Sequence, residues 1–512
     1  MHLPALFRSV LLAALAAPAF SHAVPKAAPE ARAAMPAYES ADLREQQALG
    51  NTTHGYLKAR DYKGLEAQYA RVKGAGERTP SGLWKLARFY TALRAFGVQS
   101  QDAAQWDALH GMAKAWQKQY PRSVPARLFE VYLVLQRTEA KRGTQFYNEL
   151  TEQQRRDLSQ GSASAMRLLA EAQDLADKAG DPEWQRAMLN VFPYSNGFTE
   201  ARYQARIAAA MARHPDYHDA FFTAARYSLA QWRGAPDAVD LIARALDKAG
   251  GADQGAMYAR IYWYMDQFSY KGKLFDTTPV DWPAMRASFD VLVAQYPDPW
   301  NLNAYAYFAC LAGDRASTAR LLERIGQQVE PLAWGENGAA MQARCAADTA
   351  PDPHFERKQA SVRIERLRRT RGEMLGHAAT QSSHKQYQEA IDTLQRAGDM
   401  ERALGWDSMQ LHYNLADAYF ALKRYEDAVS ALSAGLRSQP GFPDAYWMRG
   451  RAFEALGRTD EARADFATGA GHLRKALPAA WAGLNPTQRA NVERMQAKFR
   501  EYGFDTPTFQ GQ

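Results

Sequence analysis

Small and aromatic residues recur at one fixed interval in the C-terminal part of the chain. Each pair is separated by 34 positions: Ala416 and Gly450, Tyr419 and Phe453, Leu422 and Leu456, Ala428 and Ala462, Leu432 and Phe466, Gly435 and Gly469. A fixed period of this length indicates a repeated supersecondary unit that buries its apolar face against the next copy. Small residues allow two helices to cross closely, and the aromatic residues fill the wedge between neighbouring hairpins. Pro440 ends the second helix of its copy, because proline cannot continue a helix.

These two copies resemble the tetratricopeptide repeat (TPR). The first matches it at Leu415, Ala416, Tyr419, Ala428, Leu432 and Pro440, and the second at Gly450, Phe453, Ala462 and Phe466. Arg474 stands where the family usually has proline. A preceding segment, 384–394, aligns with 424–432 at an offset of 38, which indicates an insertion around Asp399–Trp406. The resemblance covers about residues 356–475 and implies stacked helical hairpins with a concave face.

The N-terminal two-thirds show a looser recurrence. Tyr120-Pro121, His214-Pro215 and Tyr296-Pro297 each follow a helix-like run, and a leucine follows each proline after 14 positions. Each copy indicates a helix, a turn that starts at proline, and a second helix. Convincing alternating strand segments are absent from the sequence. We therefore predict an all-α fold, an α-solenoid of helical hairpins with a TPR array at the C-terminus. The arrangement resembles bacterial exported proteins in which an uncharacterised all-helical domain precedes TPR repeats, and that resemblance implies no particular activity.

The N-terminus predicts export. Arg8 precedes an apolar run, Ser9 to Phe20, and Ser21-His22-Ala23 offers small residues where a signal peptidase cleaves. The run is too short to span a bilayer, and no later segment is long and apolar enough, so we expect no transmembrane segment in the mature chain. The expected location is the periplasm or the exterior of a bacterium. The predicted domains are 1–23 signal peptide, 24–40 flexible lead-in, 41–345 helical-hairpin domain of unknown function, 346–354 linker, 355–480 TPR-like repeats, and 481–512 C-terminal helix and tail.

The basic stretch of the chain and its two cysteines can each be interpreted in two ways. The chain carries a net charge of +7, much of it between Arg357 and Arg371. We interpret this stretch as a solvated helix face with Val362, Ile364 and Leu367 partly turned inward, rather than as a surface for anionic lipid or an acidic partner. No nucleic-acid partner is expected of an exported protein. Cys310 and Cys345 either form one disulfide in an oxidising compartment or remain buried thiols.

Motifs with possible chemistry have simpler structural explanations. Ser382 and Lys385 form an SxxK spacing, but the KTG element of penicillin-recognising acylases is missing. His214 and His218 have a zinc-like spacing, which Pro215 interrupts. An aromatic-rich segment is interpreted as core rather than as a ligand groove: Tyr258, Tyr262, Trp263, Tyr264 and Phe268. We predict no catalytic residue, no cofactor and no metal.

The groove of the TPR-like repeats is the best candidate site. Alignment with the family's groove positions points to residues on the first helices of two repeats: Tyr413, Asp417, Phe420, Trp447, Arg451 and Glu454. Asn414 fits a carboxylate clamp, but Tyr413 replaces the lysine that such a clamp needs. An aromatic groove of mixed charge fits an extended peptide or a partner helix. The alternative is an envelope enzyme, perhaps glycan-active, with acids such as Asp266 and Asp281 in the N-terminal helical domain.

Overall fold

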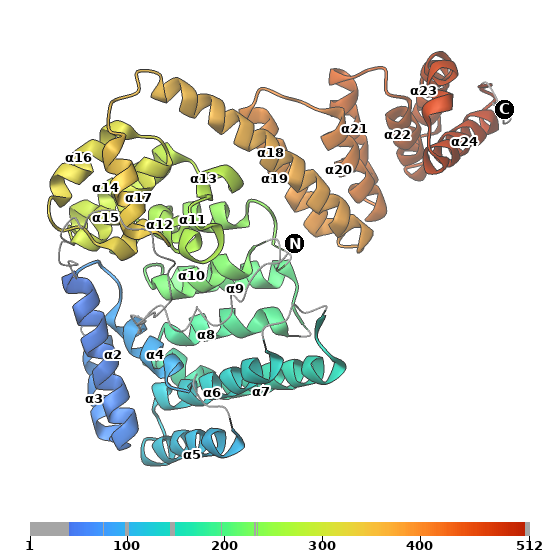
Figure 1. The fold of residues 1–512 in the computed structure, drawn as a ribbon. Coiled ribbons are helices and arrows are strands. Elements are labelled where there is room, and N and C mark those ends of the chain that lie inside the picture. Colours follow the sequence, from blue (N-terminus) through green and yellow to red (C-terminus); the bar gives the residue numbers. More distant parts are fainter. Residues whose placement is uncertain are drawn as a thin grey trace. The chain divides into compact units, whose positions relative to one another are not determined.

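The computed structural model describes residues 40–74, 76–97, 102–143, 149–195, 197–229, 232 and 234–506. The predicted signal peptide and the lead-in up to residue 39 lie outside them. All regular elements in these ranges are helices, and the pairing of β type is a single isolated bridge between Arg78 and Trp84. The fold is therefore all-α, as predicted, and Figure 1 shows its helices.

The chain divides into two compact units, each with cores of its own. Unit 1 comprises residues up to 234 and 238–360, and unit 2 comprises 361 onward with 235–237. The α-helices that begin in unit 1 are α2 (Ala41–Ala59), α3 (Tyr62–Gly74), α4 (Lys85–Ala95), α5 (Ala103–Gln119), α6 (Val124–Arg142), α7 (Glu152–Ala179), α8 (Glu183–Val191), α9 (Glu200–Arg213), α10 (His218–Tyr227), α11 (Ala238–Lys248), α12 (Met257–Met265), α13 (Leu274–Thr277), α14 (Trp282–Gln295), α15 (Pro299–Leu311), α16 (Arg315–Ile325), α17 (Gly338–Ala347) and α18 (Phe355–Ser383). Unit 2 continues with α19 (Tyr387–Ala403), α20 (Met409–Ala421), α21 (Tyr425–Ser438), α22 (Pro443–Ala455), α23 (Thr459–Ala480) and α24 (Pro486–Glu501).

Short helices of other types complete unit 1 and unit 2. They are η2 (Phe192–Tyr194), the π-helix η4 (Asp266–Tyr270), η5 (Pro331–Trp334) and η6 (Trp481–Gly483).

In unit 1, successive helices pack on one another as a series of layers. Contacts run from α5 to α6, α7 and α8, then through α10 and α12 to α14 and α15. The three predicted proline turns lie between α5 and α6, α9 and α10, and α14 and α15. In each, the residue before proline donates its N–H to the carbonyl four residues earlier, as in Tyr120 to Trp116 at 2.9 Å. Proline has no N–H to continue that pattern, so the helix ends there.

The core of unit 1 is rich in aromatic residues. Tyr258, Tyr262 and Met265 on α12 are all buried, which places this segment in the core as predicted. Tyr264 stacks on Phe222, with ring centroids 4.5 Å apart.

A disulfide joins Cys310 of α15 to Cys345 of α17, with Cα atoms 5.8 Å apart. Of the two alternatives for these cysteines, a disulfide or two buried thiols, the structure has the disulfide.

In unit 2, the helices pair as hairpins: α18 with α19, α20 with α21, and α22 with α23. Ala416 and Ala428 lie in one core cluster, as their spacing predicts. Gly450 lies against the ring of Phe466, and a Cβ on this glycine would be 2.5 Å from that ring. The turn inside each hairpin contains one residue with positive φ, namely Lys385, Lys423 or Gly457.

Departures from the repeat have visible consequences. α21 ends two residues before Pro440, whereas α23, which has Arg474 in place of that proline, continues to Ala480 and includes Pro478 near its end. The insertion before the second hairpin lengthens α19 to 17 residues, against 14 in α21. After α23, α24 packs Phe499 against Phe466, with ring centroids 6.1 Å apart.

Candidate functional site

The predicted groove residues lie on the first helices of two hairpins of unit 2. Tyr413, Asp417 and Phe420 belong to α20, whereas Trp447, Arg451 and Glu454 belong to α22. A hollow of about 300 Å³ opens between α22 and α24. Its lining consists of Trp447, Arg451, Glu454, Arg494, Ala497, Lys498 and Glu501. Three predicted residues therefore line the hollow, and the three on α20 do not.

Arg451 is held between two aromatic rings. The carbon of its guanidinium lies 4.8 Å from the ring centroid of Phe420 and 4.7 Å from that of Trp447. Rings at this distance attract the cation through their quadrupoles and restrict its side chain. The structure thus brings together three of the predicted residues, from α20 and α22, around one positive charge.

Glu454 contacts α24. Its carboxylate accepts a hydrogen bond from the hydroxyl of Tyr502 at 2.5 Å and pairs with the ammonium of Lys498 at 2.7 Å. Lys498 also pairs with Glu501. Glu454 therefore fastens α24 to α22, a role that its position in the repeat did not predict.

The α20 side of the groove is acidic and partly desolvated. Tyr413 packs edge-to-face on Phe442, with centroids 5.8 Å apart, and is only partly exposed. Burial raises the pKa of Tyr413, and the nearby carboxylates of Asp444 and Asp417 act in the same direction. Asp417 is exposed, yet surrounding protein removes enough water to raise its pKa, against the opposing effect of Arg451. Burial likewise raises the pKa of Asp444.

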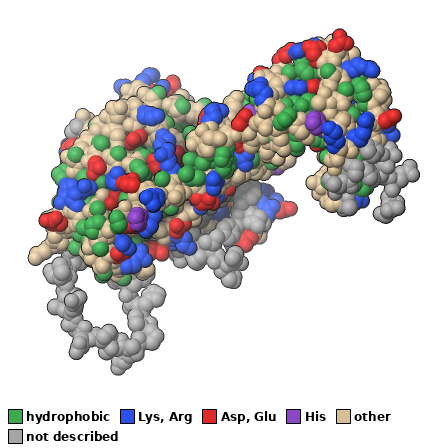
Figure 2. Space-filling view, turned by 90° about the horizontal axis from the view of Figure 1, so that it is seen from above, with side chains coloured by type: hydrophobic (Ala, Val, Ile, Leu, Met, Phe, Trp, Pro, Cys, Tyr) green, Lys and Arg blue, Asp and Glu red, His purple; other side chains and the backbone are tan. Residues whose placement is uncertain are grey.

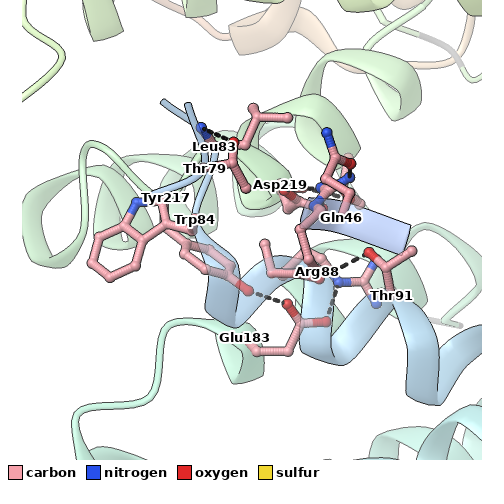
Figure 3. Close-up of polar contacts among 12 residues, drawn as sticks. Gln46, Thr79, Leu83, Trp84, Arg88, Thr91, Glu183, Tyr217 and Asp219 are labelled. Atoms are coloured by element: carbon pink, nitrogen blue, oxygen red, sulfur yellow. Dashed lines mark hydrogen bonds and ion pairs between the residues drawn. The ribbon is translucent and has the colours of Figure 1, made fainter. Parts of the chain in front are cut away.

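Unit 1 contains a buried network of charged side chains that sequence reasoning missed. Glu183 is fully buried and accepts hydrogen bonds from Tyr132 and Tyr217, each at 2.6 Å, and from Arg94 and Arg186. These partners come from α4, α6, α8 and the start of α10, so the network joins four helices. Figure 3 shows the contact between Glu183 and Tyr217. None of these residues is close to another in sequence except Glu183 and Arg186, so no local pattern reveals the network.

Neighbouring acids in the same region are also paired. Asp181 accepts from the hydroxyls of Tyr69 at 2.7 Å and Tyr90 at 2.5 Å, and burial raises its pKa. Asp219 binds the guanidinium of Arg88 through both oxygens, each at 2.9 Å (Figure 3). Each carboxylate is thus held by fixed donors, an arrangement that fits a structural role.

The motifs with zinc-like and acylase-like spacing each lie at a helix end and the adjoining turn. Ser382 is in the last turn of α18 and Lys385 lies in the turn that follows the helix, where its N–H donates to the carbonyl of Ser382. His214 follows α9, whereas His218 starts α10 and bonds Asp253 at 2.8 Å. Within the described ranges no group of three or more His, Cys, Asp or Glu residues could hold a metal ion.

The two acids considered for an enzyme have different surroundings. Asp266 is buried at the start of η4, and its carboxylate accepts from the N–H of Gly272 at 3.0 Å and from the hydroxyl of Tyr307 at 3.2 Å. Burial raises the pKa of Asp266 to about 6, although both hydrogen bonds oppose this shift. Asp281 is only partly buried and precedes α14, with its N–H donating to the hydroxyl of Tyr258.

The expectation for the basic stretch was wrong in one respect. Val362 and Ile364 are 39% and 44% exposed rather than turned inward. The buried stripe of α18 begins at Arg366 and continues through Thr370 and Met374, so the turn with Val362 and Ile364 precedes the packed part of the helix. On the face shown in Figure 2, basic and acidic side chains are intermingled. Among the residues that the structure describes, no helix is long and apolar enough to cross a membrane.

Comparisons with known proteins agree with the repeats. Residues 413–471 match the family model for the tetratricopeptide repeat. No curated protein matches the chain.

Several solved structures align over most of the chain, but at low similarity. The human IFIT1 dimer with m7Gppp-AAAA is 13% identical, with 83% of this chain and 81% of that chain covered and a TM-score of 0.21. Yeast Tom70 is 12% identical, with 88% and 99% covered and a TM-score of 0.20. The Cut9–Hcn1 hetero-tetramer of the APC/C is 12% identical, with 88% of this chain and 96% of that chain covered and a TM-score of 0.19. Because these TM-scores are far below those of a shared fold, the assignment rests on the repeats themselves. The chain contains tetratricopeptide repeats at residues 413–471, on α20 to α23.

Proposed function

We propose that the chain is an exported, non-catalytic binding protein whose repeats hold a protein or peptide partner in the groove beside α20, α22 and α24. The hollow between α22 and α24 is the observation that carries this proposal. It is open, and it is lined by an aromatic ring and charged side chains, the mixture that suits an extended peptide. TPR-type hairpins present such side chains from rigid helices, so these helices lose little conformational freedom when a peptide binds.

The buried acids of unit 1 support a non-catalytic role for that unit. Glu183, Asp181 and Asp219 accept hydrogen bonds from tyrosine and arginine side chains that are themselves packed. A carboxylate fixed in this way stabilises its neighbours rather than meeting a substrate.

A capture experiment tests the groove. Tagged wild-type chain and the variants Trp447→Ala and Tyr413→Ala are incubated with a bacterial envelope extract, and captured proteins are identified by mass spectrometry. We expect partners that the wild type retains and both variants lose. Trp406→Ala is the matched control, because Trp406 is an exposed tryptophan of unit 2 that neither lines the hollow nor belongs to the predicted groove residues. Equal capture by all four proteins, with unchanged circular dichroism, would refute a groove-based function.

Export is a separate part of the proposal. It is supported by the signal-like segment and is consistent with the disulfide between Cys310 and Cys345, since disulfides persist in oxidising compartments. When the gene is expressed in a bacterium, the mature chain from the periplasmic fraction should begin at Val24. Recovery in the cytosol with the N-terminal segment intact would contradict export.

A further inference from the structure

The hollow between α22 and α24 has unneutralised positive charge. Its cations are Arg451, Arg494 and Lys498, and its acids are Glu454 and Glu501. Both acids pair with Lys498. In the described part of the chain, no carboxylate lies within ion-pair distance of either arginine, so two guanidinium groups are left for an incoming anion.

Arg451 is preorganised for such a ligand. Its guanidinium carbon lies 4.8 Å from the ring centroid of Phe420 and 4.7 Å from that of Trp447, and no side chain or carbonyl among the described residues accepts its N–H donors. Stacking on a ring leaves the edge of a guanidinium available, and that edge matches the two oxygens of a carboxylate. Lysine would present one point charge and no plane for stacking.

Two further donors lie on the same lining. Arg494 is exposed on α24, and among the residues that the structure describes its side chain bonds Asn491 of its own helix and no other. The indole Nε1 of Trp447 is buried without a hydrogen-bond partner in the ranges described. Unpaired donors of this kind are costly unless a ligand or water accepts from them.

The acids nearby limit which anion fits. Asp417 is close enough to Arg451 for the guanidinium to oppose the rise in its pKa, and Asp444 and Asp417 both raise the pKa of Tyr413, so the α20 side repels a ligand that is negative along its whole length. A ligand with one acidic side chain, flanked by neutral or basic residues, suits both halves of the groove. The open hollow leaves room for the peptide to continue past the charged residue.

We propose that the groove recognises an extended peptide segment through an Asp or Glu side chain, whose carboxylate binds Arg451 and Arg494. This inference rests on the proposed groove function and adds the chemistry of the partner. It differs from a lysine- and asparagine-based clamp on a C-terminal carboxylate, for which Tyr413 replaces the required lysine.

Selection from a peptide library tests the inference. The full chain is immobilised, and short random peptides with amidated C-termini are selected at low ionic strength. We expect an Asp or Glu at one position of the enriched peptides. The affinity of a selected peptide is then measured by fluorescence anisotropy, beside a matched peptide in which that acid is replaced by its amide. The amide peptide should bind roughly tenfold or more weakly, since a charge-assisted hydrogen bond contributes about 1.5–3 kcal/mol.

Variants assign the effect to the guanidinium. Arg451→Gln should lower the affinity for the acidic peptide to that for the amide peptide, and Arg451→Lys should restore it only in part. Arg437→Gln is the control, because Arg437 is exposed on α21 and does not line the hollow. Circular dichroism confirms that each variant is folded.

The outcomes separate this inference from the groove function. Enriched peptides that need Trp447 but contain no acid would overturn the carboxylate inference and leave the groove function intact. Binding only of peptides with a free C-terminal carboxylate would also overturn it, in favour of a terminal clamp. Binding unaffected by Trp447→Ala and Tyr413→Ala would refute the groove function itself.

Discussion

Glu183 accepts hydrogen bonds from two tyrosines and two arginines in the middle of unit 1. The side chains of Arg94 and Arg186 are only 16% and 8% exposed, and both pair with this carboxylate. Arg94 also pairs with Asp219 at 3.5 Å. Removing one member of a buried ion pair leaves the other charge uncompensated. The stability of unit 1 therefore depends on a residue whose position, at the start of a nine-residue helix, gives no hint of it.

The first prediction concerns this residue. Glu183→Gln should lower the free energy of unfolding by about 3–5 kcal/mol, because Arg186 loses its buried partner and Arg94 keeps only its longer ion pair with Asp219. Urea denaturation followed by circular dichroism measures the change. Glu171→Gln is the control, since the Glu171–Arg167 pair is largely exposed and should contribute less than about 1 kcal/mol. Equal effects of the two substitutions would show that the network does not stabilise the fold.

The second prediction is a pH dependence at Asp266. Its pKa in the folded chain, about 6, is above the value of about 4 in an unfolded chain, so the folded state takes up a proton first. The stabilisation from that proton is complete below about pH 4 and is lost as the pH rises through about 6. Asp266→Asn removes this loss.

We therefore expect the stability of Asp266→Asn, relative to wild type, to rise by about 2–3 kcal/mol between about pH 4 and pH 8. Urea denaturation of both proteins across this range gives the difference. A difference that stays constant with pH would mean that Asp266 has an ordinary pKa.

At the scale of elements, the helix crossings of unit 2 depend on where a side chain can fit. Gly450 and Gly471 both lie inside helices, but their surroundings differ. A Cβ at Gly450 would lie 2.5 Å from the buried ring of Phe466, whereas nothing lies within 4 Å of a Cβ at Gly471. The same substitution should therefore have opposite effects at the two sites.

The third prediction uses this contrast. Gly450→Ala should destabilise unit 2 by about 1–3 kcal/mol through overpacking against Phe466. Gly471→Ala should stabilise it by about 0.5–1 kcal/mol, because alanine favours the helix. Thermal unfolding of both variants gives the signs. Stabilisation by Gly450→Ala would show that α22 and α23 are not in close contact at this glycine.

The fourth prediction concerns the bridge between α15 and α17. The disulfide closes a loop of 35 residues, and a cross-link of that size contributes about 2–4 kcal/mol by restricting the unfolded chain. Replacing both Cys310 and Cys345 by alanine should therefore lower the thermal midpoint. A reductant should lower the midpoint of the wild type and leave the double variant unchanged. Two reactive thiols in unreduced, denatured wild type would contradict the bridge.

At the scale of the whole molecule, the core residues of the two units form separate clusters. One cluster spans unit 1, and the clusters around Ala416, Phe466 and Met374 belong to unit 2. Between α17 and α18, residues 348–354 are not helical and are mostly exposed. Exposed segments without regular structure are where proteases cut folded chains first.

The fifth prediction follows from this organisation. Brief treatment with a nonspecific protease should cut between 348 and 354, near the end of unit 1, before it cuts within the packed helices of either unit. Mass spectrometry of the fragments locates the cut, and thermal unfolding of the whole chain should show two transitions. Early cuts spread evenly through 41–347 would show that unit 1 has no stable core of its own.

Local spacing was enough to establish much of unit 2 before any coordinates. The 34-residue interval identified the hairpins, the pairing of Ala416 with Ala428, and the end of α21 before Pro440, because helix crossing and helix termination depend on nearby residues. The same positions identified Trp447 and Arg451 as lining residues, since the repeat determines which side chains leave each helix on the groove side. The proline turns of unit 1 were visible for the same reason.

The spacing of residues along the sequence could not predict contacts between distant segments. The partners of Glu183 are spread from Arg94 to Tyr217, and the role of Glu454 depends on Lys498 and Tyr502, which follow the last repeat. The choice between a disulfide and two thiols likewise depended on how α15 meets α17. Periodicity is a property of one helix or one hairpin, whereas pairing of buried charges requires the three-dimensional packing of several, and only the tertiary structure contains that information.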